Sequence, residues 1–543
     1  MLLEAVIKFF SIQSVILVLC VFLVNLFLSV GYSFGFDQVP VSAKALSMGN
    51  AVTAYPLGPM SIHFNPACLS ALKEKEFTFG VTALLSMKIK SEVGVSPDYE
   101  SDLLIIEKDD PLPPAAGSAT DGAMKYPVFG SRNDLVAPNM SVSRRKPGSK
   151  WTFGFGMYSP HFMGFVRDDY DDPGRFGGKR SYRQRFVYAA PSLACQVTKT
   201  VSIGFAVALG QTYRGLKSDF RASSDILEIT KILGEATEGL EIPIASELTL
   251  PQPWFNGGLP AYETMATLKI DVKDNLDTSY NIGMLWEPFS WVSLGVCYRS
   301  EAKSEPTGKY SIQYSPQFQQ FAAWFGESPL TVSLAATLGL PIGGVPVQQG
   351  TLIMKNSKEP QNAQFGIMLK PFKGLRMMCD ATWTDWSTIK SEVYKFDKQI
   401  QLFQVAGVGG YSSGPMTYTI LRDLKDIWNV SFGVELAPFE WLSLRAGYQK
   451  QESYVRDKYF EMSLPVQDME IYSAGLGAKL GSRWSIDLAA IYMESDTYRN
   501  NYTEGSLISS KELSSILHNP FKGMDYEQKS RASWMSVSFN YIW

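Results

Sequence analysis

Apolar residues alternate with small or polar residues along most of the chain after Leu72. From residue 77 to residue 85 the odd positions are apolar and the even positions are mostly small or polar. The same period of two recurs in residues 151–157, 201–209, 428–436 and 535–543. Alternation over about ten residues, with aromatic residues at the ends, is typical of strands in an outer-membrane barrel. A soluble β-sandwich alternates too, but the opposite face here holds Gly, Ser, Thr, Asn and isolated charges, which favours a water-filled lumen.

Short turn sequences divide these segments into hairpins. Tight turns are predicted at residues 146–149, 197–200, 287–290, 370–374, 437–440 and 479–482. These six turns join twelve strands, and the segments near 76–88 and 531–543 bring the predicted total to fourteen. An even number of antiparallel strands, with short turns at one end and long loops at the other, matches a bacterial outer-membrane barrel. Closure is expected because lipid offers no partner to an unpaired backbone group.

The N-terminal 33 residues have the pattern of a secretory signal peptide. Lys8 precedes an uncharged run over residues 9–30, which is followed by the small residues Gly31 and Ser33. This arrangement predicts cleavage before Phe34 and export of the protein. Retention of the run as a helical membrane anchor is the alternative.

The next segment, residues 34–72, precedes the first predicted strand. It mixes Gly, Ala, Ser and Pro with few charges, which favours a plug folded into the barrel over an unstructured leader. Asn65-Pro66-Ala67 would form the bend that returns the plug to the wall, because Pro fixes φ and an Asn side chain satisfies a turn. The predicted organisation is a signal peptide over 1–33, a plug over 34–72 and a barrel with long extracellular loops over 73–543.

The composition agrees with a membrane barrel and argues against other classes of protein. Of the 543 residues, 13% are aromatic and 19% are charged, fewer than the roughly 25% of ordinary soluble domains. The mean hydropathy of −0.05 is too balanced for a helical membrane protein. A formal net charge of −3 argues against a nucleic-acid-binding protein, which usually has a basic face.

No catalytic, metal or cofactor site is expected. The chain has three His and five Cys, and the Cys residues are scattered without C-x-x-C spacing. Residues 410–414 fit G-x-S-x-G, but they lie in a glycine-rich loop without the strand–turn–helix context of a nucleophile. The sequence therefore predicts a protein that is not an enzyme.

Several short segments share the pattern of one family of membrane proteins. They are residues 42–51, Asn65-Pro66-Ala67, and residues 188–194, 295–300, 384–387, 442–448 and 464–465. In this order they resemble the FadL/TodX outer-membrane transport family, the channels for long-chain fatty acids and hydrocarbons. The resemblance implies a fourteen-stranded barrel with an N-terminal plug. It also implies that the mature N-terminus, here Phe34, Gly35 and Phe36, reaches toward the bound ligand. The chain departs from the family in its longer loops and in Gly58-Pro59, where acidic residues are common.

Two long loops carry helix-like apolar faces. Their aligned residues are Ile226, Ile229 and Leu233 in one loop and Phe318, Phe321 and Phe325 in the other. Apolar helices outside a core favour a groove that collects hydrophobic ligands, and packing of the two helices on each other is the alternative. The resemblance implies that paired loop helices form the entry groove of the family.

Alternation also assigns charged residues to the lumen. Arg299 and Arg445 face inward when their apolar neighbours face lipid, and the same count places Asp380, Glu435 and Asp487 inside. This assignment is physically favoured because charges are costly on the lipid face. The two arginines would then bind a fatty acid carboxylate or form ion pairs with these acids.

These features predict an outer-membrane channel for passive uptake of hydrophobic compounds, with long-chain fatty acids as the leading ligand. Ligand capture in the loop groove and rearrangement of the plug would carry the ligand inward. The expected partners are a hydrophobic small molecule, membrane lipid and lipopolysaccharide, and we expect a monomer that binds no nucleic acid. The alternative is an outer-membrane scaffold or secretion-complex component that binds proteins through its loops. A general porin for polar solutes is third.

Overall fold

The structure is a computed structural model that describes residues 41–543 with gaps. The gaps are residues 73–74, 96–114, 122–123, 127–129, 133–135, 168, 223–226, 228–230, 233, 237–242, 246–247, 261–262, 409–412, 461–462 and 501–523. The predicted signal peptide over 1–33 and the candidate residues Phe34, Gly35 and Phe36 lie outside the described residues.

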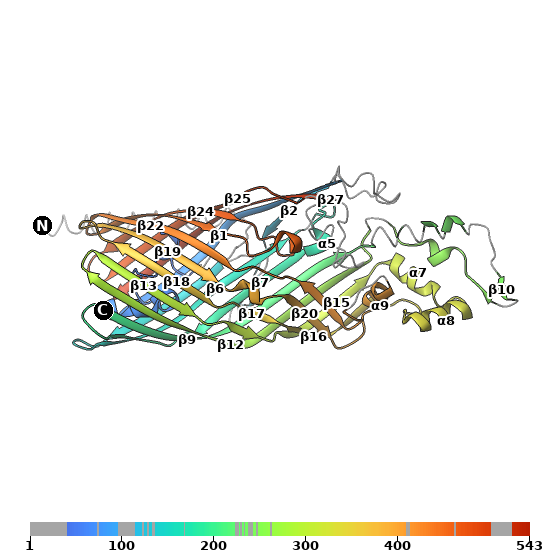
Figure 1. The fold of residues 1–543 in the computed structure, drawn as a ribbon, viewed down its shortest axis with the longest axis horizontal. Helices are drawn as coiled ribbons and strands as arrows, with labels where there is room; N and C mark the ends of the chain where they lie inside the picture. The colour runs from blue at the N-terminus through green and yellow to red at the C-terminus, as the bar shows by residue number, and fades with distance from the viewer. Residues whose placement is uncertain are drawn as a thin grey trace, which may run out of the picture.

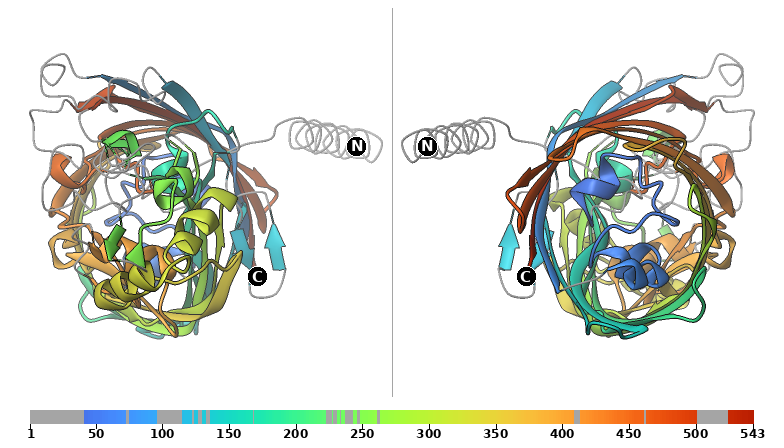
Figure 2. Two further views of the ribbon diagram at one scale, coloured as in Figure 1. Left: turned by 90° about the vertical axis from the view of Figure 1, so that its right-hand side faces the viewer. Right: turned by 90° about the vertical axis from the view of Figure 1, so that its left-hand side faces the viewer.

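The described strands form one closed antiparallel barrel with fourteen wall strands, as the sequence predicts (Figures 1 and 2). The first strand pairs with the last to close the wall. Seven wall strands are single segments: β1 (Glu76–Val95), β6 (Trp151–Val166), β9 (Val201–Phe220), β12 (Ala266–Phe289), β23 (Leu442–Gln451), β24 (Met469–Leu480) and β27 (Met524–Ile542). The other seven are each built from consecutive shorter segments.

These composite strands follow the chain in the same order as the barrel wall. They are β2 (Ala115–Asp121) with β5 (Val136–Arg145); β7 (Arg180–Ala189) with β8 (Ser192–Gln196); β13 (Val292–Arg299) with β14 (Ala302–Ser304) and β15 (Thr307–Tyr314); β16 (Val347–Lys355) with β17 (Ser357–Glu359) and β18 (Asn362–Leu369); β19 (Leu375–Thr384) with β20 (Ser391–Phe396); β21 (Thr417–Leu421) with β22 (Ile427–Phe439); and β25 (Trp484–Ser495) with β26 (Tyr498–Asn500).

The remaining elements are short. Two small hairpins are β3 (Met124–Tyr126) with β4 (Gly130–Arg132) and β10 (Pro243–Ala245) with β11 (Leu248–Thr249). The helices are α2 (Ala43–Leu46), α3 (Ser61–Phe64), η1 (Pro66–Ala71), α5 (Arg175–Gly178), η2 (Trp254–Gly257), α7 (Pro316–Trp324), α8 (Pro329–Leu338), η3 (Trp386–Thr388), α9 (Gln401–Val408) and η4 (Asp457–Tyr459). Among the described residues, no helix is long and apolar enough to cross a membrane.

Tight turns close one end of the barrel, at the six positions expected from the sequence. They join β5 to β6, β8 to β9, β12 to β13, β18 to β19, β22 to β23 and β24 to β25. Gly148 and Gly481 have φ values of +75° and +77° in two of these turns, a conformation that other residues rarely adopt. We call this the turn end. The opposite end, called the loop end, carries α7 and α8 (Figure 1).

The outer face near the turn end is apolar. On β12 the even residues from Tyr280 to Trp286 are exposed, whereas Asn281 and Leu285 between them are buried. Exposed aromatic residues follow the turn end around the wall: Phe289, Trp291, Phe439, Trp441, Trp484 and Trp543. Such an aromatic girdle marks the edge of the lipid-facing band of a membrane barrel. The predicted alternation of lipid-facing and lumenal residues is therefore confirmed in this half.

In the half of the barrel nearer the loop end, bulges reverse which side chains of a strand point into the lumen. In β1 the pairing register with β27 shifts between Leu84 and Ser86. The even residues Thr78 and Thr82 are buried before this shift, and the odd residues Met87 and Ile89 are buried after it. One extra residue in a strand changes which side chains face the lumen, because the side-chain period is two.

Candidate functional site

Residues 41–72, here called the inner segment, lie inside the barrel (Figure 2). Their side chains are almost all buried, and α2, α3 and η1 are separated by turns. Backbone groups of the segment are bound by side chains of the wall: Thr53 N–H donates to Asp380 at 2.7 Å and Gly49 N–H donates to the Ser473 hydroxyl at 3.1 Å. Asp380 therefore faces the lumen, as the sequence predicts.

Glycines of the wall let the backbone of the inner segment approach closely. A Cβ atom on Gly447 would lie 2.1 Å from the backbone nitrogen of Gly49. A Cβ atom on Gly204 would lie 2.3 Å from the backbone nitrogen of Ala67. Gly283, Gly295, Gly433 and Gly475 also face the segment with no room for a side chain. The wall is therefore shaped to hold this segment.

Asn65 ties the inner segment together and to the wall. Its side-chain oxygen accepts from the Ala67 N–H at 3.0 Å, which caps η1, and Pro66 occupies the first turn of that helix. Its amide nitrogen donates to the carbonyls of Thr53 and of Met284 on β12, at 2.8 and 3.0 Å. Asn65, Pro66 and Ala67 are thus brought together at the wall, as structural contacts of the segment.

Arg299 on β13 faces the lumen and contacts the inner segment. Its guanidinium donates to the His63 carbonyl at 2.6 Å and contacts His63 Nε2 at 3.1 Å. A guanidinium only donates, so Nε2 must be the acceptor and His63 must be neutral. Burial, together with the charge of Arg299, holds the pKa of His63 well below its usual range, which agrees with this geometry.

Arg445 on β23 lies in a buried network near the turn end. It donates to Glu435 and to Asp487, both at 2.7 Å, and the Tyr55 hydroxyl donates to Glu435 at 3.0 Å. Glu435 and Asp487 are therefore lumenal, as predicted, and Arg445 forms the ion pairs that the sequence offered as one of its two roles. The carboxylate of Asp487 raises the pKa of Lys44, so this lysine of the inner segment stays charged beside the network.

Replacing Glu435 by Gln should destabilise the barrel strongly. The carboxylate is 1% exposed and pairs with Arg445, so its loss leaves a buried guanidinium short of one partner. Removal of one partner from a buried pair costs about 3–5 kcal/mol. Urea unfolding of the purified protein would measure the loss. Lys373→Gln is the matched control. Both Lys373 and its partner Glu440 are exposed, so their ion pair should contribute nothing measurable to the free energy of unfolding. Equal stability of the two variants would contradict the assignment.

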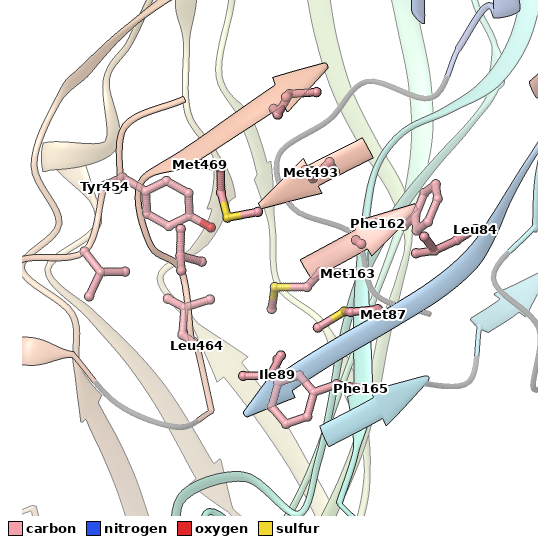
Figure 3. Close-up of a cluster of buried hydrophobic side chains, with 14 of the residues drawn as sticks. Leu84, Met87, Ile89, Phe162, Met163, Phe165, Tyr454, Leu464, Met469 and Met493 are labelled. Atoms are coloured by element: carbon pink, nitrogen blue, oxygen red, sulfur yellow. The ribbon is translucent and has the colours of Figure 1, made fainter. Parts of the chain in front are cut away.

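A first apolar cluster lines the lumen near the loop end (Figure 3). It includes Leu84, Met87, Ile89, Phe162, Met163, Phe165, Tyr454, Leu464, Met469, Met493 and Trp534, all buried. The side chains come from β1 and β6 on one side and from β24, β25 and the preceding loop on the other (Figure 3). Methionine adapts to ligands of varied shape because its side chain is unbranched and polarisable. The sequence did not single out these residues, and five of the eleven follow register shifts in β1 or β6: Met87, Ile89, Phe162, Met163 and Phe165.

A second apolar cluster lies on the arc of wall from β9 to β21. It includes Leu216, Phe220, Ile270, Tyr310, Phe318, Phe321, Leu352, Tyr394, Phe403, Tyr418 and Ile420. Helix α7 contributes Phe318, and the Ser315 side chain caps this helix by accepting from the Phe318 N–H. Phe318 stacks on Tyr314 with ring centroids 4.8 Å apart, and Phe321 stacks on Phe255 at 5.3 Å. Phe318, Phe321 and Phe325 are therefore covered by aromatic neighbours, whereas Ile226, Ile229 and Leu233 lie outside the described residues.

Exposed apolar residues at the loop end lie on α8 instead. Leu334 and Leu338 on this helix and Ile342 after it are each at least 40% exposed. They belong to a stretch from residue 328 to 354 that contains no charged residue. Large apolar side chains gathered at one exposed site mark an interaction surface.

A layer of buried charges borders the second cluster toward the turn end. On β9, Arg214 is the next inward-facing residue from Leu216 in the direction of the turn end. On β20, Glu392 is the next inward-facing residue from Tyr394 in the same direction. Glu392 pairs with Arg183 of β7, and Arg422, which follows β21, donates to it at 2.8 Å. Strands β9, β12, β15 and β16 separate β7 from β20 along the wall, so the Arg183–Glu392 pair bridges the lumen.

The described part of the second wall strand is in two segments, which meet β1 beside the first apolar cluster. β5 pairs with β1 as far as Ala83, and β2 takes over the pairing from Ile89. Between them β3 and β4 pair with each other. Leu84 and Met87 lie on β1 between these two pairings, and Phe162 and Met163 occupy the facing part of β6. The change of partner on β1 therefore lies beside the apolar inner face of the wall.

The structure is a closed barrel that encloses the inner segment and two apolar clusters. The family described as outer membrane protein transport protein (OMPP1/FadL/TodX) matches residues 32–543. The chain belongs to this family. No curated protein matches it by sequence. As a FadL/TodX family member it is an outer-membrane transport protein, and the family's channels carry hydrophobic compounds.

Solved structures agree with this fold. A Pseudomonas aeruginosa FadL homologue has a TM-score of 0.64 at 15% identity, covering 94% of this chain and 99% of that chain. The Pseudomonas putida toluene transporter TodX has a TM-score of 0.56 at 15% identity, covering 93% and 98%. The Ralstonia pickettii toluene transporter TbuX has a TM-score of 0.53 at 14% identity, covering 93% and 98%.

Family membership confirms four predictions made from the sequence. They are the FadL/TodX resemblance, the fourteen-stranded barrel, the Gram-negative outer-membrane location and the assignment as a transport protein rather than an enzyme. The turn end is therefore periplasmic and the loop end extracellular.

Proposed function

We propose that this FadL/TodX family member takes up long-chain fatty acids or similar amphiphiles, with a long apolar chain and one carboxylate. The observation that carries the proposal is the border between the second apolar cluster and the arginines. Arg214 is the next inward-facing residue beside Leu216, and Arg422 is the next beside Ile420. A single ligand can therefore contact the apolar cluster and the arginines at the same time. A guanidinium binds a carboxylate through charge-assisted hydrogen bonds, whereas a pure hydrocarbon has no use for it.

Entry is proposed to begin at the exposed surface of α8 and the segment after it. Ligand would pass from Leu334, Leu338 and Ile342 into the apolar clusters below. The predicted helix with Ile226, Ile229 and Leu233 is proposed to complete the capture groove, and Phe318, Phe321 and Phe325 to support it from beneath. Apolar surface supports this route because it lowers the free energy of a chain that leaves water.

Release is proposed to involve the inner segment acting as a plug. Phe34, Gly35 and Phe36 would contact the ligand and shift when it binds, and Asn65, Pro66 and Ala67 would keep the rest of the plug at the wall. Lateral exit is proposed at the wall beside Leu84 and Met163, where the ligand would meet lipid instead of the charged layer. Association with membrane lipid and lipopolysaccharide, and a monomeric state, are part of the same proposal.

Replacing Arg214 by Gln should weaken oleate binding about tenfold and leave toluene binding unchanged. A hydrogen bond between charged groups contributes about 1.5–3 kcal/mol, and about 1.4 kcal/mol is tenfold in affinity. Titration calorimetry on the purified protein with oleate, oleyl alcohol and toluene would separate the head group from the chain. Radiolabelled oleate uptake in a host without its own transporter would test transport itself.

Arg531→Gln is the control for this experiment, because Arg531 is exposed on the outer face and pairs with Glu494. It should bind all three ligands like the unmodified protein. Equal loss of oleate and toluene binding in Arg214→Gln would exclude a head-group role for this arginine. Failure of oleate uptake, with protein partners recovered from the outer membrane, would favour the scaffold.

A further inference from the structure

A lysine-lined pocket opens on the outer wall near the extracellular end. It encloses about 800 Å³ between β9, β12, β15 and β16. Its polar lining includes Lys269, Lys273, Lys309, Asp271, Thr351 and Gln349. None of these residues belongs to the lumenal clusters or to the charged layer.

The register shows that the pocket faces outward. On β12 the residues between the lysines, Ile270 and Val272, are buried in the second apolar cluster. Lys269 and Lys273 therefore point to the opposite side of the wall, because side chains alternate along a strand. Asp271 is paired with Lys309 of β15 in the strand register, which brings the third lysine into the same patch.

The pocket lies just beyond the lipid-facing band. Leu276 is the last large apolar residue exposed on the outside of β12, at 58%. Lys273 and Lys269 follow three and seven residues further from the membrane. At about 3.3 Å per residue and a strand tilt of about 40°, they lie roughly 8 and 18 Å above Leu276. In a Gram-negative outer membrane, phosphorylated sugars of lipopolysaccharide occupy this depth.

The charges of the pocket suit an anion. Three lysines surround two carboxylates. Asp271 already accepts from the Tyr182 hydroxyl and lies 3.9 Å from Lys269, and Asp397 accepts from the N–H and the hydroxyl of Thr351, both at 3.0 Å. Within the described residues, Lys273 and Lys309 form no ion pair. By contrast, the nearby outer-wall lysines Lys303 and Lys355 pair with Glu301 and Glu305 at 2.8 and 2.7 Å. Positive charge is therefore left over in the pocket while neighbouring lysines are neutralised.

We propose that this pocket binds a phosphorylated saccharide of the lipopolysaccharide inner core. Lys269, Lys273 and Lys309 bind the phosphate, and the hydroxyl and amide groups of Thr351 and Gln349 bind the sugar. The pocket anchors the extracellular half of the barrel to the surrounding leaflet. The site is on the outer wall, so it does not depend on the ligand that the lumen carries.

The test compares binding of purified lipopolysaccharides to the delipidated full-length barrel by native mass spectrometry. The probes are a form with a phosphorylated inner core, the same core without phosphate, and lipid A alone. We expect the phosphorylated core to bind at least about tenfold more tightly than the other two, and added salt to weaken it by screening. The triple variant Lys269→Gln, Lys273→Gln and Lys309→Gln should lose this preference.

The matched control is the triple variant Lys303→Gln, Lys355→Gln and Lys358→Gln, which removes paired lysines from the same face. It should keep the preference for the phosphorylated core. Heat-modifiable mobility in gels would establish that both triple variants are folded. Equal binding of lipid A alone, or equal loss in the two triple variants, would overturn the proposal.

Discussion

Replacing Gly447 by Val should displace residues 41–72 from the barrel wall. A Cβ atom there would lie 2.1 Å from the Gly49 nitrogen and 2.3 Å from the Met48 carbonyl carbon. Both are backbone atoms, so no side chain can rotate away, and the segment must move as a unit. Overpacking ordinarily costs about 1–3 kcal/mol, and we expect a cost at or above the top of that range here.

Two measurements would detect this displacement. Lys44 is half-buried inside the barrel in the unmodified protein, so trypsin should cleave after it much faster once the segment has moved. Conductance across a planar bilayer should rise as the lumen opens. Gly94→Val is the matched control, because a Cβ on this strand glycine meets nothing within 4 Å. A Gly447→Val barrel that resists trypsin and conducts no more ions would contradict the close fit.

Replacing Met163 and Met493 together by Gln should weaken ligand binding by about two orders of magnitude. Gln has nearly the shape of Met, so the packing of the first apolar cluster is kept while two amides are placed among apolar groups. An amide buried without a hydrogen bond costs roughly 1–3 kcal/mol, and about 1.4 kcal/mol is tenfold in affinity. Titration of the purified double variant with oleate and toluene would measure the loss for both ligand types.

The control for the methionine experiment is the double variant Met163→Leu and Met493→Leu. A volume-conserving change between apolar residues usually costs less than about 1.5 kcal/mol, so binding should fall far less. Comparison with Arg214→Gln separates the chain from the head group, because that variant should affect oleate alone. If the double Gln variant binds both ligands normally, the first apolar cluster is not on their path.

The fold was predictable from the sequence because each strand crosses an environment with two different faces. Between the tight turns and the first bulge, alternation such as that of residues 428–436 follows directly from lipid outside and a polar lumen inside. The lumenal positions of Asp380, Glu435, Asp487, Arg299 and Arg445 followed from the same count. Their partners could not be read in this way, since Arg445 and Asp487 are distant in sequence and meet only through β24 and β25.

Bulges hid part of the first apolar cluster. In β1 the apolar odd positions continue in phase from Phe77 to Ile89, so the sequence pattern shows no break. The extra residue near Leu85 turns Met87 and Ile89 inward, and the only signal is the change of the even positions from small residues to Lys88 and Lys90. The exposed face of α8 was not predicted for a different reason, because the aromatic residues of α7 form the stronger helical pattern although they are buried.

By itself the sequence determined the number of strands, the positions of six turns and the family, and it predicts an export signal that lies outside the described residues. Each depends on short-range order, namely an apolar run, a period of two or a turn motif, and lipid enforces that order residue by residue. Only the tertiary structure decided which residues share the lumen. The fit of Gly447 to Gly49 and the Arg183–Glu392 bridge join parts of the chain far apart in sequence. Such contacts depend on strand register and bulges, which no local pattern encodes.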